Sequence, residues 1–183
     1  MPWTLIAAAH RTLDGINEHV GRAVAWLTLF MVLVTFGVVV ARYGFDAGSI
    51  AAQESVMYLH ALVFMLGAGY TLRHDGHVRV DMVYRRLSPR ARQWVDLLGT
   101  VLLLFPVCGF ILWVAWDDVA ASWAVREGSQ EAGGLPWFWL LKTVVLVMPV
   151  LLMVQGAAWV LRAVLVLAGH LPPPGDEAEV QEI

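Results

Sequence analysis

The densest group of residues with metal-binding chemistry lies between positions 74 and 81. It contains two histidines and two aspartates, His74, Asp75, His77 and Asp81. Imidazole and carboxylate groups bind divalent metals, but no cysteine joins them, and nothing nearby completes the closed ligand set of a structural zinc site. The better interpretation of this stretch is a polar turn at the level of lipid headgroups, and the sequence predicts no metal site.

His60 is the second candidate, because it lies within the long apolar run 55–72. As a haem ligand it would need a second axial ligand at a comparable depth, such as another His or a Met. No other His lies within an apolar run, and methionines occur in any apolar helix. We therefore predict no cofactor, and we expect His60 to form a hydrogen bond with a neighbouring helix.

Other signatures of catalysis are absent from the sequence. It has no Walker motif, no nucleophile elbow and no HExxH zinc motif, so we expect a protein that is not an enzyme. Glu54 begins the second apolar run and could bind a coupling ion. Arg42 ends the first run, so the two residues are more simply predicted to form a structural ion pair.

The composition is too apolar for a soluble protein. Of the 183 residues 59% are hydrophobic and 15% are charged, whereas soluble domains average about 45–50% apolar residues. The net charge of -3 gives no reason to expect binding to nucleic acid. The single cysteine, Cys108, excludes an internal disulfide and suits a small apolar filler.

Four uncharged runs predict four transmembrane helices, and hence an all-α membrane protein. Arg22 and Arg42 bracket the first run and Lys142 and Arg162 the fourth; twenty helical steps between each pair cover about 30 Å, the thickness of bilayer hydrocarbon. The predicted spans are residues 23–41, 55–72, 94–116 and 140–168, within a membrane domain of residues 22–169. Residues 1–21 are predicted to form an amphipathic surface helix, and residues 170–183 a disordered acidic tail.

Local signals add detail to these spans. Residues 73–76 are expected to form a turn, followed by a short amphipathic surface segment with Val80, Val83, Tyr84 and Leu87. Ser88-Pro89 predicts the start of the third helix. Pro106 and Pro149 lie inside spans and should kink their helices.

The distribution of cations predicts the orientation. With the Arg-rich segment after the second run placed inside, nine cations lie on the inner side and three on the outer side. This bias predicts that both termini are cytoplasmic. The cations expected to anchor the chain at lipid headgroups are Arg22, Arg42, Arg73, Arg79, Arg85, Arg86, Lys142 and Arg162.

Several short motifs resemble the small membrane subunit of TRAP (tripartite ATP-independent periplasmic, DctQ-like) transporters over roughly residues 20–168. The most specific is Gly76-His77-Val78-Arg79-Val80-Asp81. The others are Arg42-Tyr43-Gly44-Phe45, Gln53-Glu54, Leu66-Gly67-Ala68 and Arg73. Many members carry a Trp and paired acids before the second span; here Gln53 replaces one acid and the Trp is missing. Glu127, Gly133-Gly134-Leu135-Pro136 and Lys142 resemble a subgroup for organic acids, including 2-oxo acids.

The resemblance implies partners and a role. A large membrane subunit would hold the sodium and substrate sites, and a periplasmic binding protein would deliver the substrate. This chain would be a scaffold in the bacterial inner membrane. Contact with the large subunit is expected at His60, Gly67, Ala68 and Gly69; docking of the binding protein is expected at Asp117, Asp118, Glu127 and Glu131. The alternatives are a membrane cytochrome or enzyme subunit and a free-standing membrane scaffold.

Overall fold

The computed structural model describes residues 2–78, 81–84 and 86–172, and this part of the chain is helical without β-strands. Its elements are α1 (Pro2–Phe45), α2 (Ile50–Arg73), α3 (Asp81–Tyr84), α4 (Pro89–Gly99), the π-helical turn η1 (Thr100–Leu104), α5 (Phe105–Val125) and α6 (Phe138–Leu167). Four helical stretches are long and apolar enough to cross a membrane: Trp3–Phe45, Ile50–Arg73, Pro89–Val125 and Phe138–Leu167. The predicted all-α fold with four spans is therefore confirmed. The expectations for Arg79, Val80, Arg85 and the tail from residue 173 onward fall outside the described residues.

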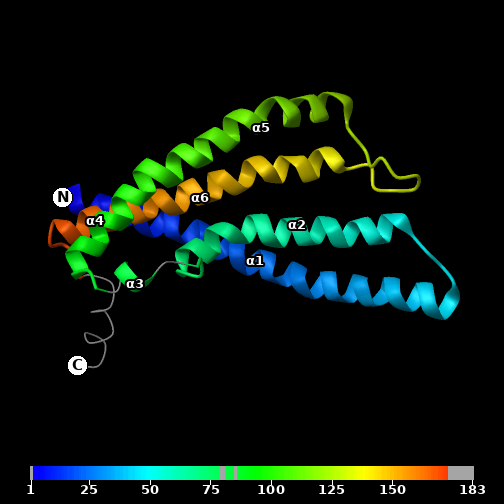
Figure 1. The fold of residues 1–183 in the computed structure, drawn as a ribbon, viewed down its shortest axis with the longest axis horizontal. Coiled ribbons are helices and arrows are strands. Elements are labelled where there is room, and N and C mark those ends of the chain that lie inside the picture. Colours follow the sequence, from blue (N-terminus) through cyan, green and yellow to red (C-terminus); the bar gives the residue numbers. More distant parts are fainter. Residues whose placement is uncertain (1, 79–80, 85, 173–183) are drawn as a thin grey trace.

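The helices form two antiparallel hairpins, α1 with α2 and α5 with α6 (Figure 1). Helix α6 packs against α1, α2, α4 and α5, so it is the centre of the bundle. Small residues allow this close approach: Ala158 is fully buried, and a Cβ at Gly156 would lie 2.7 Å from Leu104 and 2.8 Å from Phe105. In membranes small residues at helix contacts let backbones approach closely.

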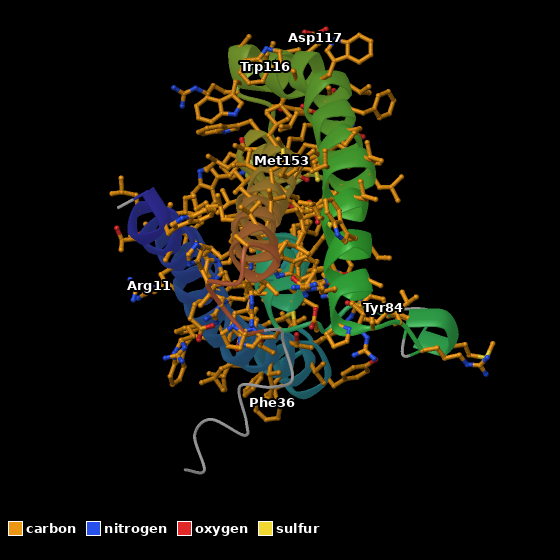
Figure 2. All side chains as sticks on the ribbon, turned by 90° about the vertical axis from the view of Figure 1, so that its left-hand side faces the viewer. Arg11, Phe36, Tyr84, Trp116, Asp117 and Met153 are labelled. Carbon is orange, nitrogen blue, oxygen red and sulfur yellow. The ribbon has the colours of Figure 1, made fainter. Side chains whose placement is uncertain are left out.

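Most of the outward surface is apolar. On α1, for example, Phe36 is 67% exposed and projects away from the bundle (Figure 2). Only 6% of the most apolar window of α1 is buried, against 33% for α6. Such a surface is stable in contact with lipid or with other membrane proteins, and not in water.

The N-terminal segment differs from its prediction. Instead of a separate surface helix over residues 1–21, α1 is one helix of 44 residues, about 66 Å long at ~1.5 Å per residue. Its first half lies along the last part of α6: the rings of Trp3 and His170 are 4.3 Å apart, and His10 Nδ1 lies 3.0 Å from the Ala158 carbonyl oxygen. The polar residues of this segment find partners on α6 and α2, so the helix has no reason to end before the membrane.

Helix boundaries follow local chemistry. The Ser88 hydroxyl accepts a hydrogen bond from the Ala91 amide and Pro89 begins α4, as predicted. Helix α2 ends at Arg73 and turns through Asp75, whose φ is 54°, so the predicted turn at 73–76 is confirmed. At the end of α6, Gly169 adopts a φ of 77°, a left-handed conformation that glycine reaches without steric cost.

The third span contains a π-helical turn ahead of its proline. The Phe105 amide donates to the Thr100 carbonyl, five residues earlier. Pro106 has no amide hydrogen, and in a regular α-helix its ring would collide with the carbonyl four residues before it. Widening the preceding turn accommodates the ring, since π-turns are one of the ways in which a helix absorbs such a conflict.

Candidate functional site

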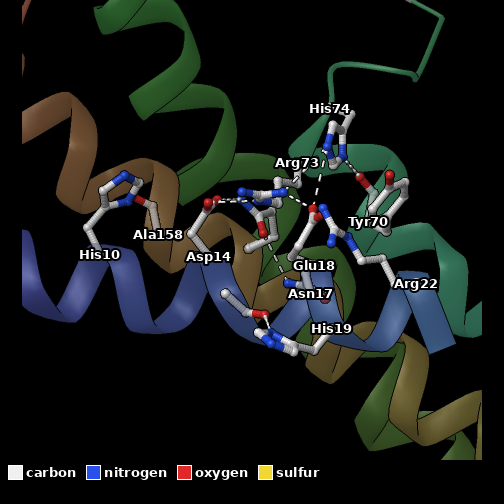
Figure 3. A network of polar contacts seen from close by, with 12 residues as sticks. His10, Asp14, Asn17, Glu18, His19, Arg22, Tyr70, Arg73, His74 and Ala158 are labelled. Atoms are coloured by element: carbon white, nitrogen blue, oxygen red, sulfur yellow. Dashed lines mark hydrogen bonds and ion pairs between the residues drawn. The ribbon is translucent and has the colours of Figure 1, made fainter.

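Polar side chains from three helices meet at the end of the bundle that holds both described termini. We call this group the Arg73 network; it consists of Asp14, Asn17, Glu18, Arg73 and Gln155 (Figure 3). It joins α1, α2 and α6 at one level of the bundle.

Two amides form the buried part of the network. Asn17 and Gln155 are both fully buried. Asn17 Nδ2 donates to the Leu151 carbonyl and to Gln155 Oε1, each at 3.1 Å, and Gln155 Nε2 donates to Asp14 Oδ1 at 3.0 Å. Because a buried amide is costly without such bonds, this chain of bonds fixes the position of α1 against α6.

Arg73 closes the network from α2. Its Nε donates to Asp14 Oδ2 at 2.7 Å and its Nη1 donates to Glu18 Oε2. Arg22 also donates to Glu18, at 2.6 Å, and His74 Nε2 lies 3.5 Å from the same carboxylate. The Arg73 side chain is only 25% exposed, so its two carboxylate partners, rather than the lipid headgroups that we predicted, neutralise its charge.

The sequence reasoning missed four members of this network: Asp14, Asn17, Glu18 and Gln155. A signal for them was present. Asp14, Asn17 and Glu18 follow helical spacing and therefore share one face of α1, and Gln155 is a polar residue inside an apolar span. Intramembrane polar residues usually face the bundle interior and pair there.

At the opposite end of the bundle, Glu54 holds the loop between α5 and α6. One carboxylate oxygen accepts a hydrogen bond from the Ser129 hydroxyl, and the other accepts from the Leu135 amide at 2.6 Å. Gly134 fits this contact, because a Cβ there would lie 2.6 Å from the Ser129 Cβ and 2.7 Å from a Glu54 oxygen. Two bonds to a charged acceptor stabilise one loop conformation.

The predicted ion pair between Arg42 and Glu54 is not formed in the structure. Both residues lie in the described part of the chain, where Glu54 bonds to Ser129 and Leu135 while Arg42 is exposed near the end of α1. The loop supplies directed N–H and O–H donors to Glu54, and these fill the sites that a surface guanidinium would have occupied.

Lys142 joins the two helices that flank the same loop. Its Nζ lies 3.1 Å from Asp118 and 2.9 Å from Glu127, and its hydrogen bond lowers the pKa of Glu127 below the ordinary range for a glutamate. Nearby, Trp123 Nε1 donates to Thr143 at 2.8 Å. Lys142 thus joins α5 and α6 at the ends next to their connecting loop, a role different from the predicted lipid anchor. Its two partners, Asp118 and Glu127, are two of the four acids expected to dock a binding protein.

The other residues that we expected to contact partner proteins or lipid headgroups include one that is buried within this chain and several that lie on its surface. Gly69 is buried inside this chain against Asn17, so it cannot contact a partner subunit. A Cβ at Gly67 would meet nothing within 4 Å, and His60 is exposed and stacks on Phe64 at a centroid distance of 6.3 Å. The hydrogen bond predicted for His60 to a neighbouring helix does not form within the described residues. The others on the surface are Arg22, Arg86, Asp117 and Glu131.

The described residues contain no cluster of three or more His, Cys, Asp or Glu side chains arranged to hold a metal ion. In the possible metal-binding turn, His74 instead faces Glu18 and the Tyr70 carbonyl. The side chain of Asp81 is outside the described part of the structure. Cys108 is 2% exposed and fills space inside the bundle, as predicted.

These features define a class of protein: a helical membrane subunit whose carboxylates and cations gather at the two ends of its bundle. The family described as the DctQ component of tripartite ATP-independent periplasmic transporters matches residues 31–166. A Haemophilus influenzae protein named as a TRAP transporter small permease protein is 26% identical over 116 residues, covering 61% of this chain and 69% of the relative. No solved structure matches the chain. This chain belongs to the DctQ family and is a small permease subunit of a TRAP transporter, a family of transporter subunits and not of enzymes.

Proposed function

We propose that this subunit is the scaffold of a sodium-coupled transporter for organic acids in the bacterial inner membrane, with 2-oxo acids among the candidate substrates. The observation that carries the proposal is the placement of charge. Each span has a long central stretch without Asp, Glu, Lys or Arg: on α1 none lies between Arg22 and Arg42, on α2 none between Glu54 and Arg73, and on α6 none between Lys142 and Arg162. Ion-coupled sites use polar groups and broken helices near the bilayer midplane, so the sodium and substrate sites belong to the large subunit.

The face proposed to meet the large subunit is one stripe of α2. Its exposed members are Gln53, Met57, His60 and Phe64, and Gly67 follows in the same register. His60 stands in the middle of this helix, at a depth where an unsatisfied imidazole is costly. A helix of the large subunit that hydrogen-bonds His60 and packs closely at Gly67 would satisfy both residues.

The outer loop is proposed to help seat the periplasmic binding protein. Asp117 and Glu131 are exposed there, while Asp118 and Glu127 help to order the loop through Lys142. The free acids would meet the partner, and the paired acids would present them on a fixed surface.

Reconstitution tests this function. In liposomes with a sodium gradient, this chain alone should give no uptake of organic acid, and the large subunit with the binding protein should need this chain for full activity. The variants Gly67→Leu and His60→Leu should weaken co-purification with the large subunit. Gly37→Leu is the matched control, because a Cβ at Gly37 also meets nothing within 4 Å but lies on α1. Uptake by this chain alone, or full transport without it, would overturn the proposal.

A further inference from the structure

The loop between α5 and α6 contains a compact unit, residues 128–136, which we call the outer strap. The Ser129 amide donates to the Leu135 carbonyl at 2.9 Å, and the Gly134 amide donates to the Glu131 carbonyl at 3.0 Å. The strap lies beyond the ends of the two helices that it joins (Figure 1). Because these hydrogen bonds lie within the strap, its residues stay together when its contacts with the helices change.

Glu54 fastens the outer strap to the other hairpin. Its carboxylate accepts hydrogen bonds from the Ser129 hydroxyl and from the Leu135 amide, and both donors belong to the strap. Glu54 itself lies in the second turn of α2. A change in the direction of this one carboxylate would therefore release both donors at once.

The Tyr58 hydroxyl is a second group on α2 that bears on this contact. It is buried and has no hydrogen-bond partner among the described residues, which is rare for a buried polar atom. Tyr58 follows Glu54 by four residues, so the two side chains are neighbours on one face of the helix. Helical side chains lean toward the start of their helix, so the Tyr58 ring leans toward Glu54, and the two groups interact electrostatically.

The carboxylate therefore has two sets of donors to choose from. A tyrosine hydroxyl donates one hydrogen bond, and an ionised carboxylate is a strong acceptor for it. Rotation about the side-chain bonds of Glu54 would exchange the two donors of the strap for the single donor of Tyr58. Two charge-assisted bonds are more stabilising than one, so the arrangement with the strap bound is the populated one.

We propose that Glu54 is a conformational switch with two positions. In the closed position, which the structure shows, the carboxylate binds the outer strap and the Tyr58 hydroxyl has no partner. In the open position the Tyr58 hydroxyl donates to the carboxylate, and the Ser129 hydroxyl and the Leu135 amide are released at the outer surface.

The released donors would face a protein that docks on the strap. A partner that offers carboxylate or carbonyl oxygens to Ser129 and Leu135 would bind the open position more tightly and would therefore populate it. The switch would then pass the docking event to α2, the helix proposed to meet the large subunit. This link rests on the proposed role of the outer loop in seating the binding protein, whereas the switch itself does not.

Amide hydrogen–deuterium exchange at Leu135, measured on the full-length chain in nanodiscs, tests the switch. Tyr58→Phe keeps the ring and removes the donor of the open position, so exchange should become slower, by about tenfold for a hydrogen bond to a charged group. Tyr43→Phe is the matched control, because Tyr43 is 85% exposed near the end of α1 and should exchange as the wild type does. Equal exchange in Tyr58→Phe and the wild type would overturn the proposal.

A Glu54→Ala background separates the switch from a general effect of Tyr58 on the strap. Without the carboxylate the hydroxyl has no acceptor to attract, so adding Tyr58→Phe should leave exchange at Leu135 unchanged. Slowing by the same factor in both backgrounds would overturn the switch, because Tyr58 would then act on the strap without Glu54.

The link to docking has its own measurement. In the reconstituted transporter, Tyr58→Phe should lower the uptake that the binding protein supports, because the open position is harder to reach, and Tyr43→Phe should not lower it. Full uptake by Tyr58→Phe, together with slowed exchange at Leu135, would remove the role in docking and leave the switch in place.

Discussion

Gly67 and Gly69 lie two positions apart in α2, but only Gly69 packs against another helix of this chain. Gly69 is buried, and a Cβ there would lie 2.1 Å from the oxygen of the Asn17 amide. Gly67 faces open space along the exposed stripe of α2. The Gly-Ala-Gly sequence alone indicates close packing at both positions, but it does not reveal that only one of them packs within this chain.

This difference gives a prediction at the residue scale. Gly69→Ala should destabilise the isolated chain, because the new Cβ would lie 2.8 Å from Asn17 Cγ and overlap the amide oxygen; overpacking of this kind costs about 1–3 kcal/mol. Gly67→Ala should leave stability unchanged or slightly raised, since alanine favours the helix by up to about 1 kcal/mol. Thermal unfolding in detergent measures both. Equal melting temperatures for Gly69→Ala and wild type would contradict the packing described here.

At the scale of elements, the residues that bind Glu54 could not be predicted from their spacing in the sequence. Arg42 was the nearest cation in the sequence, whereas the donors that bind Glu54 come from Ser129 and Leu135, 75 and 81 positions away. Sequence spacing predicts contacts within a helix because the repeat is fixed. It does not predict how a loop folds back onto another hairpin.

The Glu54 contact can be tested through the loop that it holds. Glu54→Ala removes the acceptor of the Leu135 amide and of the Ser129 hydroxyl, so the loop between α5 and α6 should open more often. Hydrogen bonds to charged groups contribute about 1.5–3 kcal/mol, which corresponds to amide exchange at Leu135 faster by about tenfold or more. Hydrogen–deuterium exchange measures it. Glu131→Ala is the control, because Glu131 is exposed in the same loop; equal acceleration in both variants would remove the specific role of Glu54.

The four spans were predictable because uncharged runs of bilayer length have few alternatives. Their boundaries were less predictable, since a helix does not end where hydrocarbon ends. Helix α1 continues for about twenty residues before the expected start at residue 23 because His10, Asp14 and Asn17 bond to α6. The π-turn also lay beyond sequence reasoning: Pro106 predicted a disturbed helix but not the wider turn that accommodates it.

At the scale of the whole molecule, the structure separates two ends of different charge. The first half of α1, the end of α2, α3, α4 and the end of α6 lie at the end with the N-terminus (Figure 1). The described cations of these segments and of the short turn between α3 and α4 are Arg11, Arg22, Arg73, Arg86, Arg90, Arg92 and Arg162, whereas the segments at the opposite end carry Arg42, Arg126 and Lys142. Both described termini lie at the cation-rich end. An even number of spans requires this arrangement, but it leaves open which end faces the cytoplasm.

The excess of cations at the end that holds both termini predicts that this end faces the cytoplasm, because segments rich in Lys and Arg are retained on the cytoplasmic side during insertion. A fluorescent reporter that folds only in the cytoplasm should be active when fused after Pro174 and inactive at Ser129. Alkaline phosphatase, which is active only outside the cytoplasm, should give the opposite pattern. A fusion at Ala47, in the turn between α1 and α2, should match Ser129, because both positions lie at the cation-poor end. If Pro174 and Ser129 report the same side, one of the four helices does not span the membrane; if both patterns are reversed, the cation bias does not set the orientation of this subunit.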